Sequence, residues 1–80
     1  MEEIRIGNKD IKRYIIAGIQ GLTNEKEIKI LGRGVHVKKA IDVAEIIRRQ
    51  MENTDVSVSI GSEKYEDRYV STIEIIIKWE

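Results

Sequence analysis

The 80-residue sequence contains no cysteine, no proline and no phenylalanine, and it has one histidine. Without cysteine there is no disulfide, no thiolate metal site and no cysteine nucleophile. No hydrophobic run approaches the roughly 18 residues that a bilayer-spanning helix needs, so no membrane partner is expected. The opening residues Met1–Ile4 include two glutamates, whereas a secretory signal peptide begins with basic residues. These absences favour a cytoplasmic protein that forms one domain over residues 1–80.

The whole chain also lacks net charge, although its two parts do not. Lysine and arginine number 14, and so do aspartate and glutamate. From Arg5 to Arg49 there are 11 basic and 5 acidic residues, whereas from Gln50 to Glu80 there are 3 basic and 7 acidic residues. Dense, balanced charge and 16 isoleucines are typical of a heat-adapted protein with surface ion pairs. So short a chain buries only about 60–65% of its unfolded surface, and oligomerisation would therefore add stability.

Hydrophobic periodicity predicts six elements in the order βαβαββ. Residues 4–7 form a short strand, and Asn8 precedes a helix over residues 9–22 that ends near Gly21. A second strand covers 27–31, and a Gly-Arg-Gly turn leads to a second helix over 37–51. Strands at 56–60 and 69–79 flank a polar segment. The order predicts a two-layer α/β (α+β) sandwich, in which a mixed sheet carries both helices on one face and the last two strands form a protruding hairpin. The apolar helix stripes include Ile16 and Ile41, which we expect in the core.

The sequence contains no pattern for catalysis, and we expect no cofactor, no metal ion and no small-molecule substrate. A nucleophile needs a base and an orienting group, yet the one histidine, His36, stands at the start of the second helix and pairs with no serine at a recognisable spacing. The acidic residues Glu63, Glu66 and Asp67 do not match a calcium loop. The segment Gly32–Gly34 lacks the remaining residues of a Walker loop or of a dinucleotide fingerprint. We therefore predict that the protein is not an enzyme.

Basic residues near the helix starts are the main functional signal. The candidate binding residues lie at the two helix starts and in the hairpin: Lys9, Lys12, Arg13, Arg33, Lys38, Lys39 and Arg68. Such cations, together with helix N-termini, can contact a nucleic-acid phosphate backbone without reading its sequence. On charge alone, ordinary solvated helix ends held in ion pairs are a slightly better explanation.

Four aromatic residues are able to stack on bases: Tyr14, Tyr65, Tyr69 and Trp79. For Tyr14 and Tyr69 we expect packing in the core or in a dimer interface instead, since tyrosine supplies a large apolar surface.

The chain resembles the Alba family of small archaeal chromatin and RNA-associated proteins over nearly its whole length. The opening IRIGNK at residues 4–9 is similar to the family's strand followed by IGKK, and Tyr14 falls at the family's helix-one tyrosine. Residues 27–34, EIKILGRG, resemble EIVIKARG. Residues 39–48, KAIDVAEIIR, are close to KAVDVAEIVR, and residues 70–75 read VSTIEI as in the family.

The resemblance implies a βαβαββ fold, a homodimer and sequence-independent binding of DNA or RNA. It places the binding surface on the loop before the second helix, the start of the first helix and the hairpin arms of the dimer. Lys9, Arg33 and Lys39 match the family's contacts, while the other four basic residues are added on electrostatic grounds. A DNA-binding member would associate with the nucleoid, and the choice between DNA and RNA stays open.

The chain departs from the family pattern mainly in its charge. Asn8 replaces the first of two lysines, Val35 replaces the second arginine of RGR, and residues 62–68 carry a net charge of −1. Each phosphate contact contributes about 0.9 to the slope of log affinity against log salt, so we predict weak, salt-sensitive binding. The alternative is a divergent member that keeps the fold and the dimer, has lost nucleic-acid binding and acts as a protein-interaction module. Hetero-dimerisation with a more basic paralogue is one route to that role.

Overall fold

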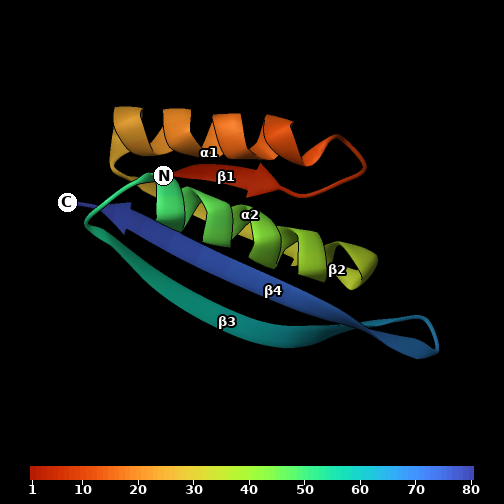
Figure 1. Ribbon diagram of the computed structural model, residues 1–80. Coiled ribbons are helices and arrows are strands. Elements are labelled where there is room, and N and C mark those ends of the chain that lie inside the picture. Colours follow the sequence, from red (N-terminus) through yellow and green to blue (C-terminus); the bar gives the residue numbers. More distant parts are fainter.

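A computed structural model describes residues 1–80 as a four-stranded sheet with two helices on one face (Figure 1). The elements are β1 (Glu2–Arg5), α1 (Ile11–Glu25), β2 (Glu27–Arg33), the 3₁₀ turn η1 (Gly34–His36), α2 (Val37–Gln50), β3 (Thr54–Tyr65) and β4 (Arg68–Trp79). The strand order is β1-β2-β4-β3, with β1 and β2 parallel and the other neighbours antiparallel. The predicted α+β architecture and its mixed sheet are confirmed.

The core lies between the sheet and the helices because alternate residues of each strand face the same side. The buried hydrophobic side chains of the strands are all isoleucines, and Ile6 directly after β1 joins them: Ile4, Ile6, Ile28, Ile30, Ile73, Ile75 and Ile77. They form one cluster with the buried helix residues Tyr14, Leu22, Ala40, Val43, Ala44 and Ile47. The other face of the sheet is mostly polar apart from Leu31 and Ile76, and it carries cross-strand ion pairs such as Lys29–Glu74, whose Nζ and Oε1 atoms lie 3.0 Å apart.

Helix α1 begins and ends later than the sequence pattern predicts. Asp10, and not Asn8, is the N-cap, and its carboxylate accepts a hydrogen bond from a backbone N–H of the first turn at 3.1 Å. Gly21 does not end the helix. It lies buried inside α1, where a Cβ atom would come within 2.7 Å of Cγ2 of Ile28, so glycine allows the helix to approach β2 closely. The helix ends at Glu25, and its C-cap, Lys26, adopts the left-handed conformation with φ of 68°.

Several apolar side chains lie elsewhere than the periodicity predicts. Ile16 is 57% exposed and Ile41 is 47% exposed, so the prediction that both lie in this core was wrong. The core stripes run instead through Tyr14 and Val43, which are buried. The burial of Tyr14 confirms its expected packing role, whereas Tyr69 is 72% exposed and lies outside the core.

The hairpin is longer and more regular than expected. The predicted polar segment at 61–68 is mostly strand, because β3 and β4 pair from Thr54 with Trp79 to Tyr65 with Arg68. β2 pairs with β4 only as far as Thr72, so the hairpin beyond this point projects from the sheet. We term residues 62–71 the arm. The arm makes the molecule elongated, with extents of 42 × 23 × 19 Å.

Candidate nucleic-acid interface

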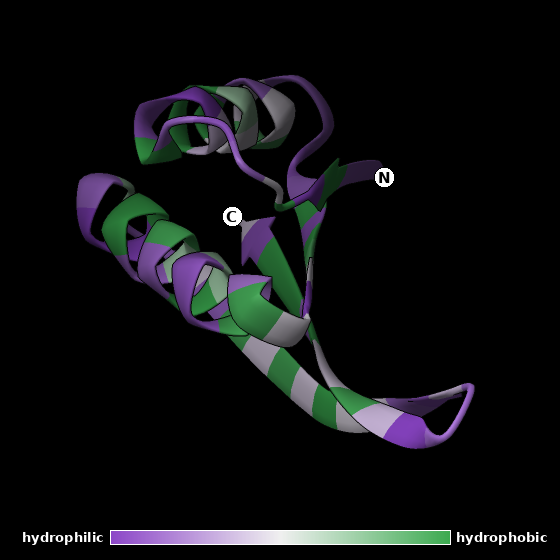
Figure 2. Ribbon diagram, turned by 90° about the vertical axis from the view of Figure 1, so that its right-hand side faces the viewer, coloured by the Kyte–Doolittle hydropathy of each residue, from purple (hydrophilic) through white to green (hydrophobic).

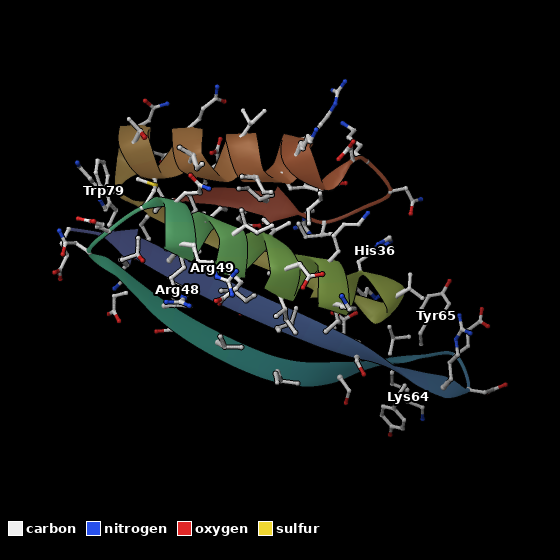
Figure 3. The ribbon with its side chains drawn as sticks, in the orientation of Figure 1. His36, Arg48, Arg49, Lys64, Tyr65 and Trp79 are labelled. Atoms are coloured by element: carbon white, nitrogen blue, oxygen red, sulfur yellow. The ribbon has the colours of Figure 1, made fainter.

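The two helix N-termini and the arm lie at one end of the molecule (Figure 1). β1 and β2 are parallel, so their C-terminal ends lie at the same end of the sheet. The helices that follow them, α1 and α2, begin at that end. Both chain termini lie at the opposite end. Figure 3 shows His36 of η1 on the same side as Lys64 and Tyr65 of the arm, with Trp79 far from them. This topology explains how segments that are distant in sequence form one surface.

All seven predicted binding residues lie on segments at this end of the molecule, which we term the basic end: Lys9, Lys12, Arg13, Arg33, Lys38, Lys39 and Arg68. Four of them are exposed and have no carboxylate oxygen within 4.0 Å, namely Lys9, Lys12, Arg13 and Arg68. Lys38 is exposed but pairs with Asp42 one turn later, at 2.9 Å between Nζ and Oδ2. The remaining two cations, Arg33 and Lys39, each have partners that the sequence pattern did not indicate.

Arg33 forms an ion pair with the arm. Its Nε lies 3.2 Å from Oε2 of Glu63, and its Cζ lies 5.4 Å from the centroid of the Tyr65 ring. Arg33 is the last residue of β2, where its side chain can reach the base of the projecting hairpin. The side chains of Arg33 and Glu63 are 52% and 59% exposed, so the pair is accessible to solvent. An approaching phosphate would compete with Glu63 for this guanidinium.

Lys39 holds the loop between β1 and α1 in place. Its Nζ donates hydrogen bonds to the backbone oxygens of Gly7 at 3.1 Å and Lys9 at 3.2 Å. The hydroxyl of Tyr14 accepts hydrogen bonds from the backbone N–H groups of the same two residues, at 2.8 Å and 3.1 Å. The backbone that carries Lys9 is therefore bound through both its donors and its acceptors. Lys39 acts here as a positioning residue.

Gly32 sets how closely α2 begins against the sheet. A Cβ atom at this position would lie 2.8 Å from Cβ of Ala40 and 2.9 Å from the backbone oxygen of His36. The backbone oxygen cannot move without displacing η1, so a larger residue would push the start of α2 away from β2. Glycine at this position thus fixes the place of Lys38 and Lys39 in the first turn of α2.

Two groups of surface ion pairs away from the basic end shift pKa values. A hydrogen bond from Arg48 lowers the pKa of Glu45, and the same bond raises the pKa of Arg48. A hydrogen bond to Glu74 raises the pKa of Lys29. Opposite charges favour the ionised form of each partner, so these groups stay charged near neutral pH.

The acidic residues and the helices show no further specialised site. No group of three or more His, Asp or Glu side chains is placed to hold a metal ion. Neither helix combines the length and the apolar composition needed to cross a membrane. The chemistry that the basic end offers is thus charge and hydrogen bonding from several elements at once.

Comparison with known proteins gives consistent results. The Alba family model matches residues 2–64. The chain is 39% identical over 85 residues to the DNA/RNA-binding protein Alba of Nitrosopumilus maritimus, an alignment that covers 96% of this chain and 90% of that protein. It is 36% identical over 84 residues to the DNA/RNA-binding protein Alba of Methanocella arvoryzae, covering 94% and 86%.

Solved structures agree with the sequence comparisons. Alba from Thermoplasma volcanium has a TM-score of 0.78 to this structure at 28% identity, covering 96% of this chain and 99% of that one. ALBA1 from Trypanosoma brucei shares the fold with a TM-score of 0.83 at 20% identity, covering 98% of this chain and 68% of that one. On the family model, the identities and the shared fold, the chain belongs to the Alba family.

Proposed function

We propose that the protein binds DNA and RNA by contacting the phosphate backbone with its basic end, without reading sequence. The observation that carries this proposal is the convergence of seven basic residues, two helix N-termini and the arm at one end of the sheet. The N-terminus of α2, which no side chain caps, adds a favourable site for phosphate, whereas the carboxylate of Asp10 already caps α1. The relatives named DNA/RNA-binding protein Alba support the same function. We propose a cytoplasmic location, and association with the nucleoid when the bound partner is DNA.

The proposed binding is weak and sensitive to salt. Only four of the seven cations are without a protein partner, because Arg33, Lys38 and Lys39 are already engaged. The arm also brings the carboxylates of Glu63, Glu66 and Asp67 to the basic end, where they would repel phosphate. Since each phosphate contact contributes about 0.9 to the salt slope, a deficit of even two or three cations removes much of a backbone-driven affinity.

We also propose that the protein works as a homodimer formed by α2 and β3. Along β3, hydrophobic and small polar residues alternate until the hydrophilic tip, as Figure 2 shows. Three apolar side chains on these elements are exposed: Ile41 at 47%, Val58 at 55% and Ile60 at 78%. Next to them Ala44, Val56 and Ile75 line a groove of about 340 Å³. An uncovered apolar strip of this kind on a small chain favours self-association. A dimer would also double the number of cations on one particle.

The binding proposal is tested with fluorescence anisotropy of duplex DNA and structured RNA in about 20–50 mM salt, where phosphate contacts are strongest. Replacing both Lys12 and Arg13 by Ala should weaken binding and flatten the salt slope by about 0.9 for each phosphate that the variant no longer neutralises. Replacing both Lys26 and Lys78 by Ala is the matched control, because it also removes two exposed cations, at the end of the molecule opposite the arm. Equal effects of the basic-end and control variants would contradict the proposal.

The dimer is tested by light scattering with a matched pair of variants. Ile60→Asp places a charge in the exposed strip of β3 and should yield monomers. Ile16→Asp is the control, because Ile16 is 57% exposed but lies on α1, outside that strip. A monomeric unmodified protein, or a dimer that tolerates Ile60→Asp, would contradict this interface.

A second candidate function is a protein-interaction module that has lost nucleic-acid binding. The acidic arm and the Arg33–Glu63 ion pair favour it, because both reduce the free positive charge of the basic end. Hetero-dimerisation with a more basic paralogue through the same α2–β3 strip would then supply the missing cations. Absence of binding to any DNA or RNA at low salt supports this candidate. Recovery of binding when Glu63, Glu66 and Asp67 are all replaced by Ala would identify the arm as the cause.

A further inference from the structure

The arm carries the two most exposed aromatic rings of the chain, since Tyr14 is buried and Trp79 is partly buried. Tyr65 is 48% exposed and Tyr69 is 72% exposed. By contrast, Tyr14 is 8% exposed, and Nζ of Lys26 lies 4.0 Å from the centroid of the Trp79 ring. Arg33 lies over the Tyr65 ring, with its Cζ 5.4 Å from the centroid, so Tyr69 is the more open of the two rings. Large aromatic surfaces normally gain stability from burial, and two rings this exposed on a narrow projection indicate a surface that meets a partner.

The two rings lie on adjacent steps of the hairpin ladder. Tyr65 is paired with Arg68, and Tyr69 is paired with Lys64. Because successive pairs of an antiparallel ladder point to opposite faces, the two rings project from opposite faces of the arm. Each ring therefore has a basic residue directly across the hairpin on its own face.

Each tyrosine also lines a shallow hollow between the arm and the residues around η1. The hollow at Tyr69 includes Gly34 and Ser71, and the hollow at Tyr65 includes Arg33 and His36. Both hollows share three residues, namely Val35, Arg68 and Val70. Val35 is 90% exposed. Aromatic and apolar surface thus lies side by side with two arginines and a histidine, which is the combination that a nucleobase with its phosphate would contact.

We propose that the arm stacks unpaired nucleobases on Tyr65 and Tyr69, so that the protein binds single-stranded nucleic acid in preference to duplex. This inference rests on the proposed function and specifies its substrate. Bases of a duplex are already stacked and paired, so only a single strand offers a free base to a tyrosine ring. Carboxylates of the arm repel the phosphates of both forms, but stacking compensates for that repulsion only in the single strand. Arg33, whose Cζ lies 5.4 Å from the Tyr65 ring centroid, is placed to pair with a phosphate beside the stacked base.

The test measures anisotropy of single-stranded RNA, single-stranded DNA and duplex DNA of one length and sequence with the full chain. Tyr65→Ala or Tyr69→Ala should weaken single-strand binding by about fivefold or more, since removal of a stacking ring costs about that much, and change duplex binding by less than about twofold. The salt slope should stay the same because no charge is removed. Tyr65→Phe and Tyr69→Phe keep the rings and should bind as the unmodified protein does.

Lys64→Ala is the control for charge on the arm, and it should weaken single-strand and duplex binding alike. If the tyrosine variants weaken binding of single-stranded RNA and single-stranded DNA equally, the recognised group is the base that both share. If they weaken binding of RNA alone, the stacking is specific to RNA bases. If the tyrosine variants leave the ratio of single-strand to duplex affinity unchanged, the stacking proposal is overturned while backbone binding stands. Failure of the unmodified protein to bind any of the three oligonucleotides would overturn both.

Discussion

Replacing Glu63 by Gln should strengthen nucleic-acid binding, because it releases Arg33 from its ion pair with the arm. Glutamine keeps the shape of the side chain and removes the charge that lies 3.2 Å from Nε of Arg33. Both side chains are more than half exposed, and exposed pairs of this kind are worth about 0.2–1 kcal/mol. If binding breaks the pair in both protomers of a dimer, the variant avoids a cost of about 0.4–2 kcal/mol, which corresponds to about two- to thirtyfold tighter binding.

The assay is anisotropy of duplex DNA over a series of salt concentrations. Arg33 contacts phosphate in both proteins on this reasoning, so the variant should bind more tightly at each salt concentration with nearly the same salt slope. Glu66→Gln is the matched control, since it removes an equal charge from the arm at a residue that forms no ion pair. Addition of Arg33→Ala to Glu63→Gln should cancel the gain. Equal gains from Glu63→Gln and Glu66→Gln would refute the reasoning, because general repulsion by the arm would then explain both.

Three further predictions concern stability. Tyr14→Phe removes the acceptor of two loop N–H groups and should lower the free energy of unfolding by about 1–3 kcal/mol in urea titrations. Gly32→Ala should cost about 1–3 kcal/mol through crowding against η1 and α2, whereas Gly61→Ala, where the added Cβ has more space, should cost less in the same assay. Glu45→Gln should lower the Tm at pH 7, and this effect should shrink as the pH falls below 4.5. The hydrogen bond from Arg48 holds the pKa of Glu45 below its ordinary 4.5, so the stabilisation is present above pH 4.5 and is lost as the pH falls through the folded-state pKa.

Most of the architecture could be predicted from local patterns. The alternating isoleucines of β2 and β4 and the 3.6-residue periodicity of the two helices are signals that tertiary packing reinforces. The arm was harder to predict because residues 61–65 are polar or charged on both faces, so no alternation marks them as a strand. These residues are in a strand because they pair with residues 68–72 of β4, on the other side of the hairpin turn. Helical periodicity placed Ile41 on the apolar stripe of α2, but periodicity alone does not tell whether such a residue packs in the core or on a surface that binds another chain.

The candidate site was predictable in its residues but not in their contacts. Sequence spacing and family resemblance selected Lys9, Arg33 and Lys39, and the structure places these residues at one end. The partners of Lys39 are 30 and 32 residues away, and the contact between Arg33 and Glu63 depends on the hairpin folding back past β2. Such contacts follow from the topology of the sheet, which no local pattern encodes.

The elongated shape of the molecule affects how its mass can be measured in solution. The radius of gyration is 12.6 Å, compared with about 11.6 Å for a compact chain of this length. A projecting hairpin increases hydrodynamic drag without adding mass, so the protein should elute early from a gel-filtration column and resemble a heavier sphere. A monomer could thereby be mistaken for a dimer, and sedimentation equilibrium, which is independent of shape, is the safer way to count protomers.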